Sequence, residues 1–219
     1  MMTVLPEGPA TEGVRSLEVR WILPGQLATP VAGWFGRFPA ETESREDTYL
    51  IQPGLRGLSV KVRAGRALEV KVYRGSPGTL AVADRARGRI ESWQKWSFPC
   101  GPLRQPGSDP PGWSPVAKRR RISRFLPGSE GIVAAAPGLA GDPACAVELT
   151  EIRSGGEAWW SLGFEATGSA DLLRSVLEAT AALAFAQALP GGVELGTDNS
   201  RSYAEWLRQR PDPRRDPGA

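Results

Sequence analysis

Basic side chains are concentrated in three strand-like segments of a chain that contains no histidine. The segments are LSVKVR (58–63), LEVKVY (68–73) and AKRRRISRF (117–125). Successive side chains of a strand point to opposite faces, so cations at alternate positions share one face of a sheet. Lys and Arg form charge-assisted hydrogen bonds with phosphate oxygens, and histidine is the commonest general base and metal ligand. The pattern therefore predicts a ligand class, phosphate-bearing anions, before it predicts any reaction.

The composition indicates one folded domain. The 219 residues are 41% hydrophobic, enough for a real core. We expect a flexible lead-in at 1–15, a single domain at 16–209 and a disordered tail at 210–219, because the tail combines Pro, Gly and charge. A net charge of +3 argues against a general nucleic-acid binder.

The sequence also bears on compartment. It has no signal-peptide pattern and no apolar run long enough to span a membrane, which predicts a soluble cytoplasmic protein without a membrane partner. Cys100 and Cys145 are too few for a disulfide framework or a zinc site, so free thiols in a reducing compartment are expected.

Short apolar-alternating segments dominate the first three quarters of the chain. Short connections such as Ala64-Gly65 favour antiparallel hairpins, and eight strands are a natural number for closing a barrel. The fold class predicted is α+β, an eight-stranded antiparallel barrel covered outside by a few helices. The expected strands are 16–23, 46–52, 57–63, 67–74, 88–97, 117–125, 145–152 and 158–165. A Pro/Gly-rich loop is expected at 99–115.

One long helix is expected from Ala170 to Leu189, with Ser169 as N-cap and Pro190-Gly191-Gly192 as its stop. Its apolar positions form one broad stripe, which predicts that it covers the outside of the barrel. Shorter helices are expected at 26–38, where Pro30 and Gly33 weaken the pattern, and at 202–209.

The order of these elements resembles the triphosphate tunnel, or CYTH-like, family over residues 17–209. Three early segments carry the resemblance: LEVRWI (17–22) stands where the family has Glu-x-Glu-x-Lys, DTYL (47–50) where it has Tyr-Asp-Thr, and 58–63 where it has Leu-Arg-x-Arg. Later ones are LEVK (68–71), ending at a tunnel lysine, FE (164–165), where paired glutamates close a metal site, and SYAEWL (202–207), similar to a terminal Ser-Tyr-x-x-Leu-Leu.

The resemblance implies a polar tunnel in which cations bind a triphosphate and carboxylates hold Mg²⁺ or Mn²⁺. The first motif, LEVRWI (17–22), departs from this pattern, because Arg20 replaces the second glutamate of the family's opening motif and Ile22 replaces its lysine. In the later segment, Gly163 stands two residues before Glu165. Arg20 would oppose a metal and could instead hold phosphate itself. The phosphate-binding residues implied are Lys61, Arg63, Lys71 and one or two of Arg119, Arg121 and Arg124, whose facing is left open by four consecutive basic residues. Arg20 is expected to add a further phosphate contact. The metal ligands implied are Glu18 and Glu165.

Three functions are compatible with the sequence. The preferred one is binding of a phosphorylated small molecule or polyphosphate, with catalysis in doubt. The second is a metal-dependent triphosphatase or adenylate-cyclase-like enzyme whose carboxylates have been relocated among Glu18, Glu69, Glu148, Glu151 and Glu165. The third is a barrel that binds an apolar ligand or a protein, with the basic faces in water.

Overall fold

Long antiparallel strands form most of the molecule. The structure is a computed structural model, and it describes residues 13–99, 112–139 and 141–210. The strands are β1 (Val14–Pro24), β2 (Glu41–Leu50), β3 (Leu58–Arg63), β4 (Ala67–Val82), β5 (Ala86–Pro99), β6 (Trp113–Gly128), β7 (Gly131–Ala134), β8 (Ala144–Ser154) and β9 (Glu157–Thr167). The helices are α1 (Thr29–Phe35), α2 (Leu173–Ala184) and α3 (Tyr203–Gln209), with a 3-10 turn at Thr197–Asn199.

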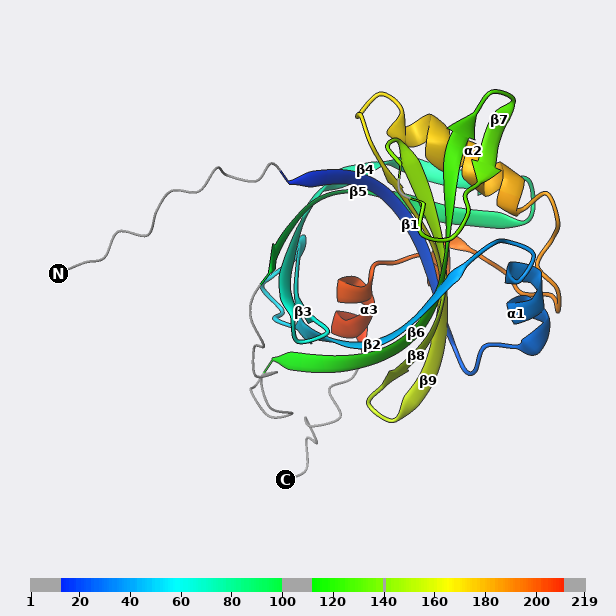
Figure 1. Ribbon diagram of the computed structural model, residues 1–219. Coiled ribbons are helices and arrows are strands. Elements are labelled where there is room, and N and C mark those ends of the chain that lie inside the picture. Colours follow the sequence, from blue (N-terminus) through cyan, green and yellow to red (C-terminus); the bar gives the residue numbers. More distant parts are fainter. Residues whose placement is uncertain (1–12, 100–111, 140, 211–219) are drawn as a thin grey trace.

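Eight of these strands close into a barrel. They follow the order β2-β3-β4-β5-β1-β9-β8-β6, and β2 pairs with β6 to complete the ring (Figure 1). Strand β7 extends the sheet beside the end of β6, outside the closed ring. The predicted α+β fold with an eight-stranded antiparallel barrel is confirmed.

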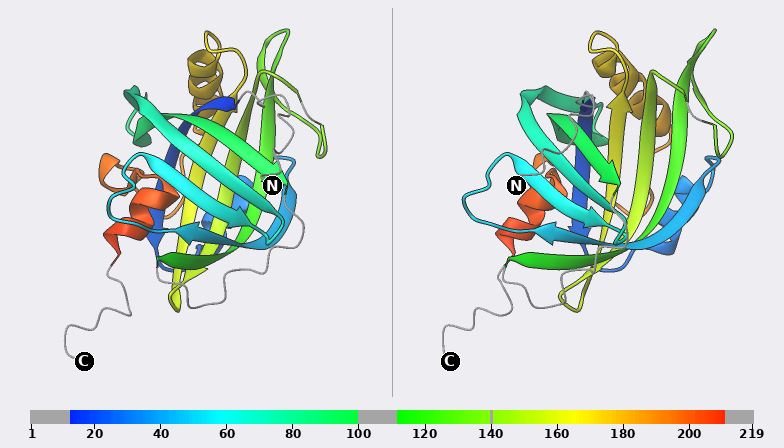
Figure 2. Two further views of the ribbon diagram at one scale, coloured as in Figure 1. Left: turned by 90° about the vertical axis from the view of Figure 1, so that its left-hand side faces the viewer. Right: turned by 60° about the vertical axis from the view of Figure 1, so that its left-hand side comes forward.

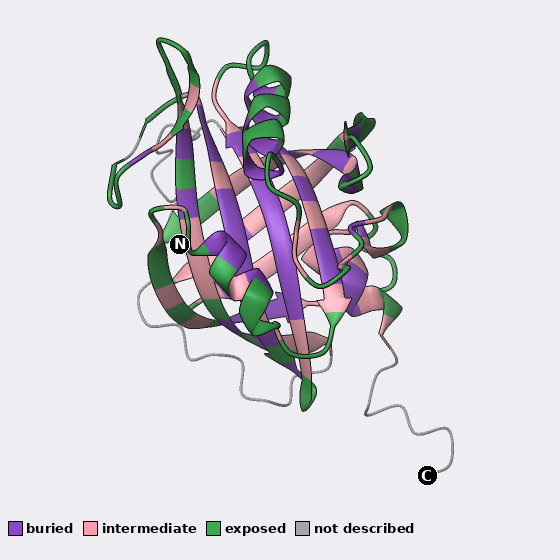
Figure 3. Cartoon of the chain, turned by 90° about the vertical axis from the view of Figure 1, so that its right-hand side faces the viewer, coloured by how far each residue is buried: buried purple, intermediate pink, exposed green. Residues whose placement is uncertain are grey.

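The main hydrophobic core lies outside the barrel, between the strands and helices α1 and α2. Strand β1 shows the alternation that builds it, because Val19 and Trp21 are buried in this core. Trp21 meets Phe164 of β9 and Phe185 beyond α2, each edge to face at 6.2 Å between ring centroids. Figure 3 shows the buried strand segments beneath the helices. With its outer face committed to this core, the barrel directs its polar side chains inward.

Helix α3 lies at one end of the barrel, where it is seen through the ring in Figure 1 and at the side in Figure 2. Trp206 is 2% exposed and packs in a second cluster with the inward-facing Ile22, Tyr49 and Ile152. The helix begins as expected, since Ser202 Oγ accepts the backbone N–H of Glu205. Helix α3 therefore covers one end of the barrel rather than its outer wall.

The predicted caps of the long helix are wrong. Helix α2 has Leu172 as N-cap, without a side-chain cap, and the Ser169 carbonyl accepts the N–H of Leu172. The helix ends at Ala184, well before Pro190, because Phe185 turns into the core and stacks on Trp34 at 5.9 Å. Tertiary packing thus overrides the sequence stop signal.

Other boundaries also differ from expectation. Strand β2 begins at Glu41 because its polar residues pair with β6 along their whole length. Strands β4, β5 and β6 are longer than predicted, and β7 was not foreseen. Helix α1 forms with Pro30 in its first turn, where a missing N–H costs no hydrogen bond.

Several expectations lie outside the described residues: most of the 1–15 lead-in, Cys100, most of the 99–115 loop, and the tail after 210. Cys145 is a free, buried thiol. Among the helices that the structure describes, none is long and apolar enough to cross a membrane.

Candidate functional site: the barrel lumen

The barrel encloses a polar cavity of about 260 Å³. Among the residues that the structure describes, nine cationic and five carboxylate side chains line it. The buried Asp47 and the partly exposed Glu43 contact lining cations from the same interior, and with both counted the cations still exceed the carboxylates by two, nine against seven. The lining cations are Arg20, Arg45, Lys61, Arg63, Lys71, Lys95, Lys118, Arg120 and Arg124. The lining carboxylates are Glu18, Glu69, Glu91, Glu148 and Glu165.

Lys71 sits between the two predicted metal ligands. Glu18 and Glu165 are cross-strand partners on β1 and β9. The Lys71 ammonium lies 2.5 Å from Glu18 Oε1 and 3.3 Å from Glu165 Oε1. Burial acts to lower the pKa of Lys71, but Glu165 and Glu18 outweigh it and raise that pKa. The Lys71 charge in turn lowers the pKa of Glu165 to about 2. Lys71 and Glu165 are therefore both ionised at neutral pH.

Arg20 occupies the space that Gly163 leaves on the neighbouring strand. The two residues are cross-strand partners, and a Cβ on Gly163 would lie 2.7 Å from Arg20 Cζ. Arg20 Nη1 donates to Glu148 Oε1 at 3.1 Å and to Ser161 Oγ at 3.2 Å, and the guanidinium lies 4.8 Å from the Tyr203 ring centroid. Burial acts to lower the pKa of Arg20, but the Glu148 charge outweighs it and raises that pKa. A fixed cation is thus built into the interior.

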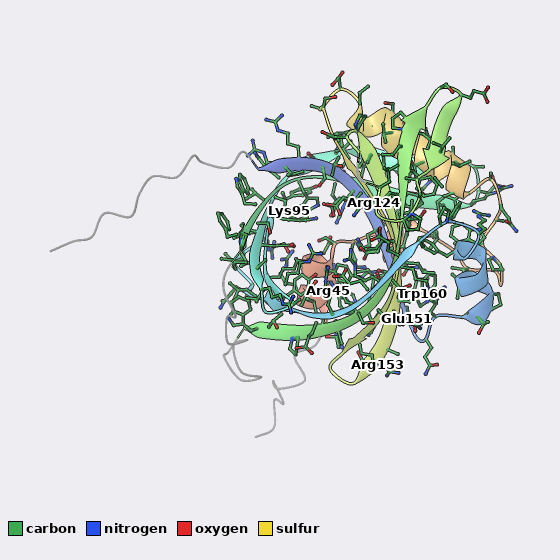
Figure 4. The ribbon with its side chains drawn as sticks, in the orientation of Figure 1. Arg45, Lys95, Arg124, Glu151, Arg153 and Trp160 are labelled. Atoms are coloured by element: carbon green, nitrogen blue, oxygen red, sulfur yellow. The ribbon has the colours of Figure 1, made fainter. Side chains whose placement is uncertain are left out.

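The facing of β6 is settled by its register. Lys118, Arg120 and Arg124 line the lumen, whereas Arg119 and Arg121 lie on the outer face, where both approach Glu151. Figure 4 shows Arg45 and Lys95 within the ring of strands, and Arg153 and Trp160 outside it. Of the three candidate arginines of this strand, only Arg124 therefore lies in the lumen, and Arg119 and Arg121 do not.

Asp47 is a buried acid surrounded by cations. Its carboxylate is fully buried, and its oxygens lie 3.0 Å from Arg45 Nε, 3.1 Å from Lys61 Nζ and 3.2 Å from Lys118 Nζ. Burial acts to raise the pKa of Asp47, but Lys61 and Lys118 outweigh it and hold that pKa far below its usual value. Lys118 also donates to Tyr49 Oη at 2.6 Å, and burial lowers the pKa of this lysine well below its ordinary value.

Three cations lie toward the end of the barrel opposite α3. Arg63 is paired with Glu69 at 3.2 Å yet keeps 42% of its side chain exposed. Lys95 is 28% exposed and lies 3.8 Å from Glu165. Arg124 is exposed, and among the described residues no ion pair involves it. These three side chains have the greatest freedom to meet a ligand.

The residues present do not fit a divalent metal ion. Magnesium requires an octahedron of oxygen ligands, and cationic side chains repel it. Lys71 separates Glu18 from Glu165, Arg20 and Arg120 both contact Glu148, and Glu151 lies outside the lumen. Within the described ranges, no group of three acidic, Cys or His side chains could hold a metal.

The structure adds lumen residues that the sequence analysis did not name as binding or metal-ligating residues: Arg45, Asp47, Lys95, Lys118, Arg120 and Tyr203. One signal in the sequence could have found two of them, Arg45 and Asp47. Glu43, Arg45, Asp47 and Tyr49 alternate along a polar segment, which is the pattern of a strand facing a polar interior.

Comparisons with known proteins give no family assignment. No family model matches the chain, and no curated protein does. A conserved hypothetical protein from Pyrococcus furiosus aligns over 86% of this chain and 98% of its own, with 14% identity and a TM-score of 0.44. A protein from Pyrococcus horikoshii OT3 aligns over 86% and 97%, with 14% identity and a TM-score of 0.40.

The solved structures also include the Pct1 RNA triphosphatase of S. pombe, aligned over 81% of this chain and 80% of its own, with 10% identity and a TM-score of 0.39. Each of these likenesses is too distant to carry an activity across to this chain. The tunnel-family resemblance stays a prediction that rests on the sequence motifs.

Proposed function

We propose that the protein binds a phosphate-bearing anion, such as tripolyphosphate or a nucleotide, in the barrel lumen. The observation that supports this is the excess of cations over carboxylates in an enclosed interior. In such a site the field of the cations is screened less than at an open surface, so it attracts an anion strongly. A volume of about 260 Å³ suits a compact polyanion more than a drug-sized apolar ligand, whose pockets span about 300–1,000 Å³.

The distribution of the cations supports a ligand with several charged groups. Lys95 lies on β5, Arg63 on β3 and Arg124 on β6, so they approach from different parts of the wall. A chain of phosphates offers oxygens in several directions, and each charge-assisted hydrogen bond contributes about 1.5–3 kcal/mol. The charged lining counts against an apolar ligand in this cavity.

Binding is proposed in preference to turnover. Phosphoryl transfer in metal-dependent enzymes relies on carboxylates that hold the metal ion. Glu18, Glu148 and Glu165 are already engaged by cations of the protein. The relocated-carboxylate enzyme therefore has no observation in its favour.

The test is calorimetric titration of the full chain with tripolyphosphate in the presence of a chelator. Wild-type protein should bind, and Arg124→Ala should weaken binding about tenfold, the loss of one charged contact. Arg119→Ala is the matched control, because it removes the same charge from the outer face of the same strand. Absence of binding by the wild type, or an equal effect of the two variants, would contradict the proposal.

A further inference from the structure

Each of the five lumen carboxylates in the described part of the chain already has a cationic side chain within ion-pair distance. Glu69 is 3.1 Å from Lys61, and Glu91 is 2.6 Å from Arg89. The remaining three are Glu18 and Glu165, which share Lys71, and Glu148, which is bound by Arg20 and Arg120. None of the five is left as a vacant ligand for a metal ion.

Two of these cations are held rigidly. Arg20 is fixed by Glu148, by Ser161 and by stacking on Tyr203. Gly163 keeps its space open, because a Cβ there would collide with the guanidinium. Lys71 is fixed between the carboxylates of two adjacent strands. A metal ion entering with a ligand would have to displace a side chain that the surrounding structure locks in place.

A metal bound to the ligand would also reduce what the lumen can recognise. Divalent cations bind polyphosphate through its oxygens, and each metal–oxygen bond removes an acceptor that Arg or Lys would otherwise use. The metal also lowers the negative charge of the ligand, which weakens its attraction to a lumen with excess cations.

We infer that the lumen selects the metal-free form of its polyanion, with Arg20 and Lys71 serving as built-in counter-charges, so that Mg²⁺ competes with the protein for the ligand. This inference rests on the proposed function and adds a regulatory property: free Mg²⁺ sets the fraction of ligand that can bind. The metal-containing site implied by the opening motif is thus replaced by one that works without metal.

The experiment is the tripolyphosphate titration repeated with chelator and with excess MgCl₂. If about nine-tenths of the ligand is magnesium-bound, the apparent Kd should rise about tenfold, in inverse proportion to the free fraction. Binding that is unchanged or tightened by Mg²⁺ overturns the inference while leaving the proposed function intact. Absence of binding in both buffers overturns the proposed function instead.

A variant tests the role of Arg20 separately. Arg20→Ala should weaken binding in chelator about tenfold, whereas Arg119→Ala on the outer face should leave it unchanged. If Arg20→Ala binds tripolyphosphate as tightly as the wild type does, Arg20 plays no part in binding the metal-free ligand. If this variant does not fold, the wild-type comparison with and without Mg²⁺ still decides whether the metal-free ligand is selected.

Discussion

Gly163→Ala tests the fit between Arg20 and its neighbouring strand. The new Cβ would lie 2.7 Å from Arg20 Cζ and 2.9 Å from both terminal nitrogens, so the guanidinium must move. Moving it weakens the contacts with Glu148 at 3.1 Å and Ser161 at 3.2 Å, and a charged hydrogen bond contributes about 1.5–3 kcal/mol. Replacing Gly by Ala in a strand also raises the unfolding free energy by about 0.5–1 kcal/mol, because the unfolded chain loses backbone entropy.

The net loss in unfolding free energy should be about 1–2 kcal/mol, which lowers the thermal midpoint of a chain this long by about 2–8 °C. Gly33→Ala on α1 is the control, because nothing lies within 4 Å of its added Cβ, and it should be neutral or stabilising. In an Arg20→Ala background the collision disappears, so Gly163→Ala should then cost nothing. The same loss in both backgrounds would refute the proposed fit.

Three further changes probe the interior and its cover. Asp47→Asn should lower the unfolding free energy by about 3–5 kcal/mol, because the substitution leaves Lys118 and the neighbouring cations without their buried counter-charge. Urea titrations measure this loss, and a value below about 1 kcal/mol would contradict the prediction. Acid should unfold the protein progressively: burial acts to raise the pKa of Glu69, but Lys61 outweighs it and lowers the pKa from 4.5 to about 2. This stabilisation, about 3 kcal/mol, is complete above about pH 4.5 and is lost as the pH falls toward 2, so urea midpoints flat between about pH 5 and 2.5 would oppose it. Trp206→Ala should cost about 3–5 kcal/mol by loosening α3 from the barrel end, and faster hydrogen exchange in α3 than in β1 would check it.

The hairpin segments of the barrel could be predicted because their signals are local. In β3 and β4, cations alternate with apolar residues, and a three-residue turn at 64–66 links the strands. Lys61 and Lys71 therefore fall on one face in the sequence as in the structure. The choice between an inward and an outward face followed from the family resemblance, together with the apolar stripe of the covering helix.

The facing of β6 could not be obtained from its basic residues, since Lys118 to Arg121 place a cation on both faces. The deciding residue is Phe125, which is fully buried in the outer core. Counting back from Phe125 in steps of two places Arg121 and Arg119 outside. This signal was present in the sequence, but it carries weight only once the outer face is known to be the apolar one.

The pairing of Arg20 with Gly163 was beyond the sequence. Both departures from the family pattern were visible in the sequence. Whether Arg20 and Gly163 lie opposite each other depends on the register between β1 and β9, and these two paired strands are separated in the sequence by all the other strands. Likewise, Lys71 can contact both Glu18 and Glu165 only because β4 lies next but one to β1 around the barrel, with β5 between them.

The position of α3 limits how a long polyanion can bind. Tyr203 and Trp206 lie at one end of the barrel, so a ligand bound as proposed is expected to enter by the other end, where Lys95 and Arg124 line the lumen. If the proposed binding holds, a long polyanion is expected to insert its terminus rather than to thread through the barrel. The number of polyphosphate molecules bound should accordingly follow the number of chain ends, so that cutting one long chain into many short ones raises the binding capacity of the same mass of polymer.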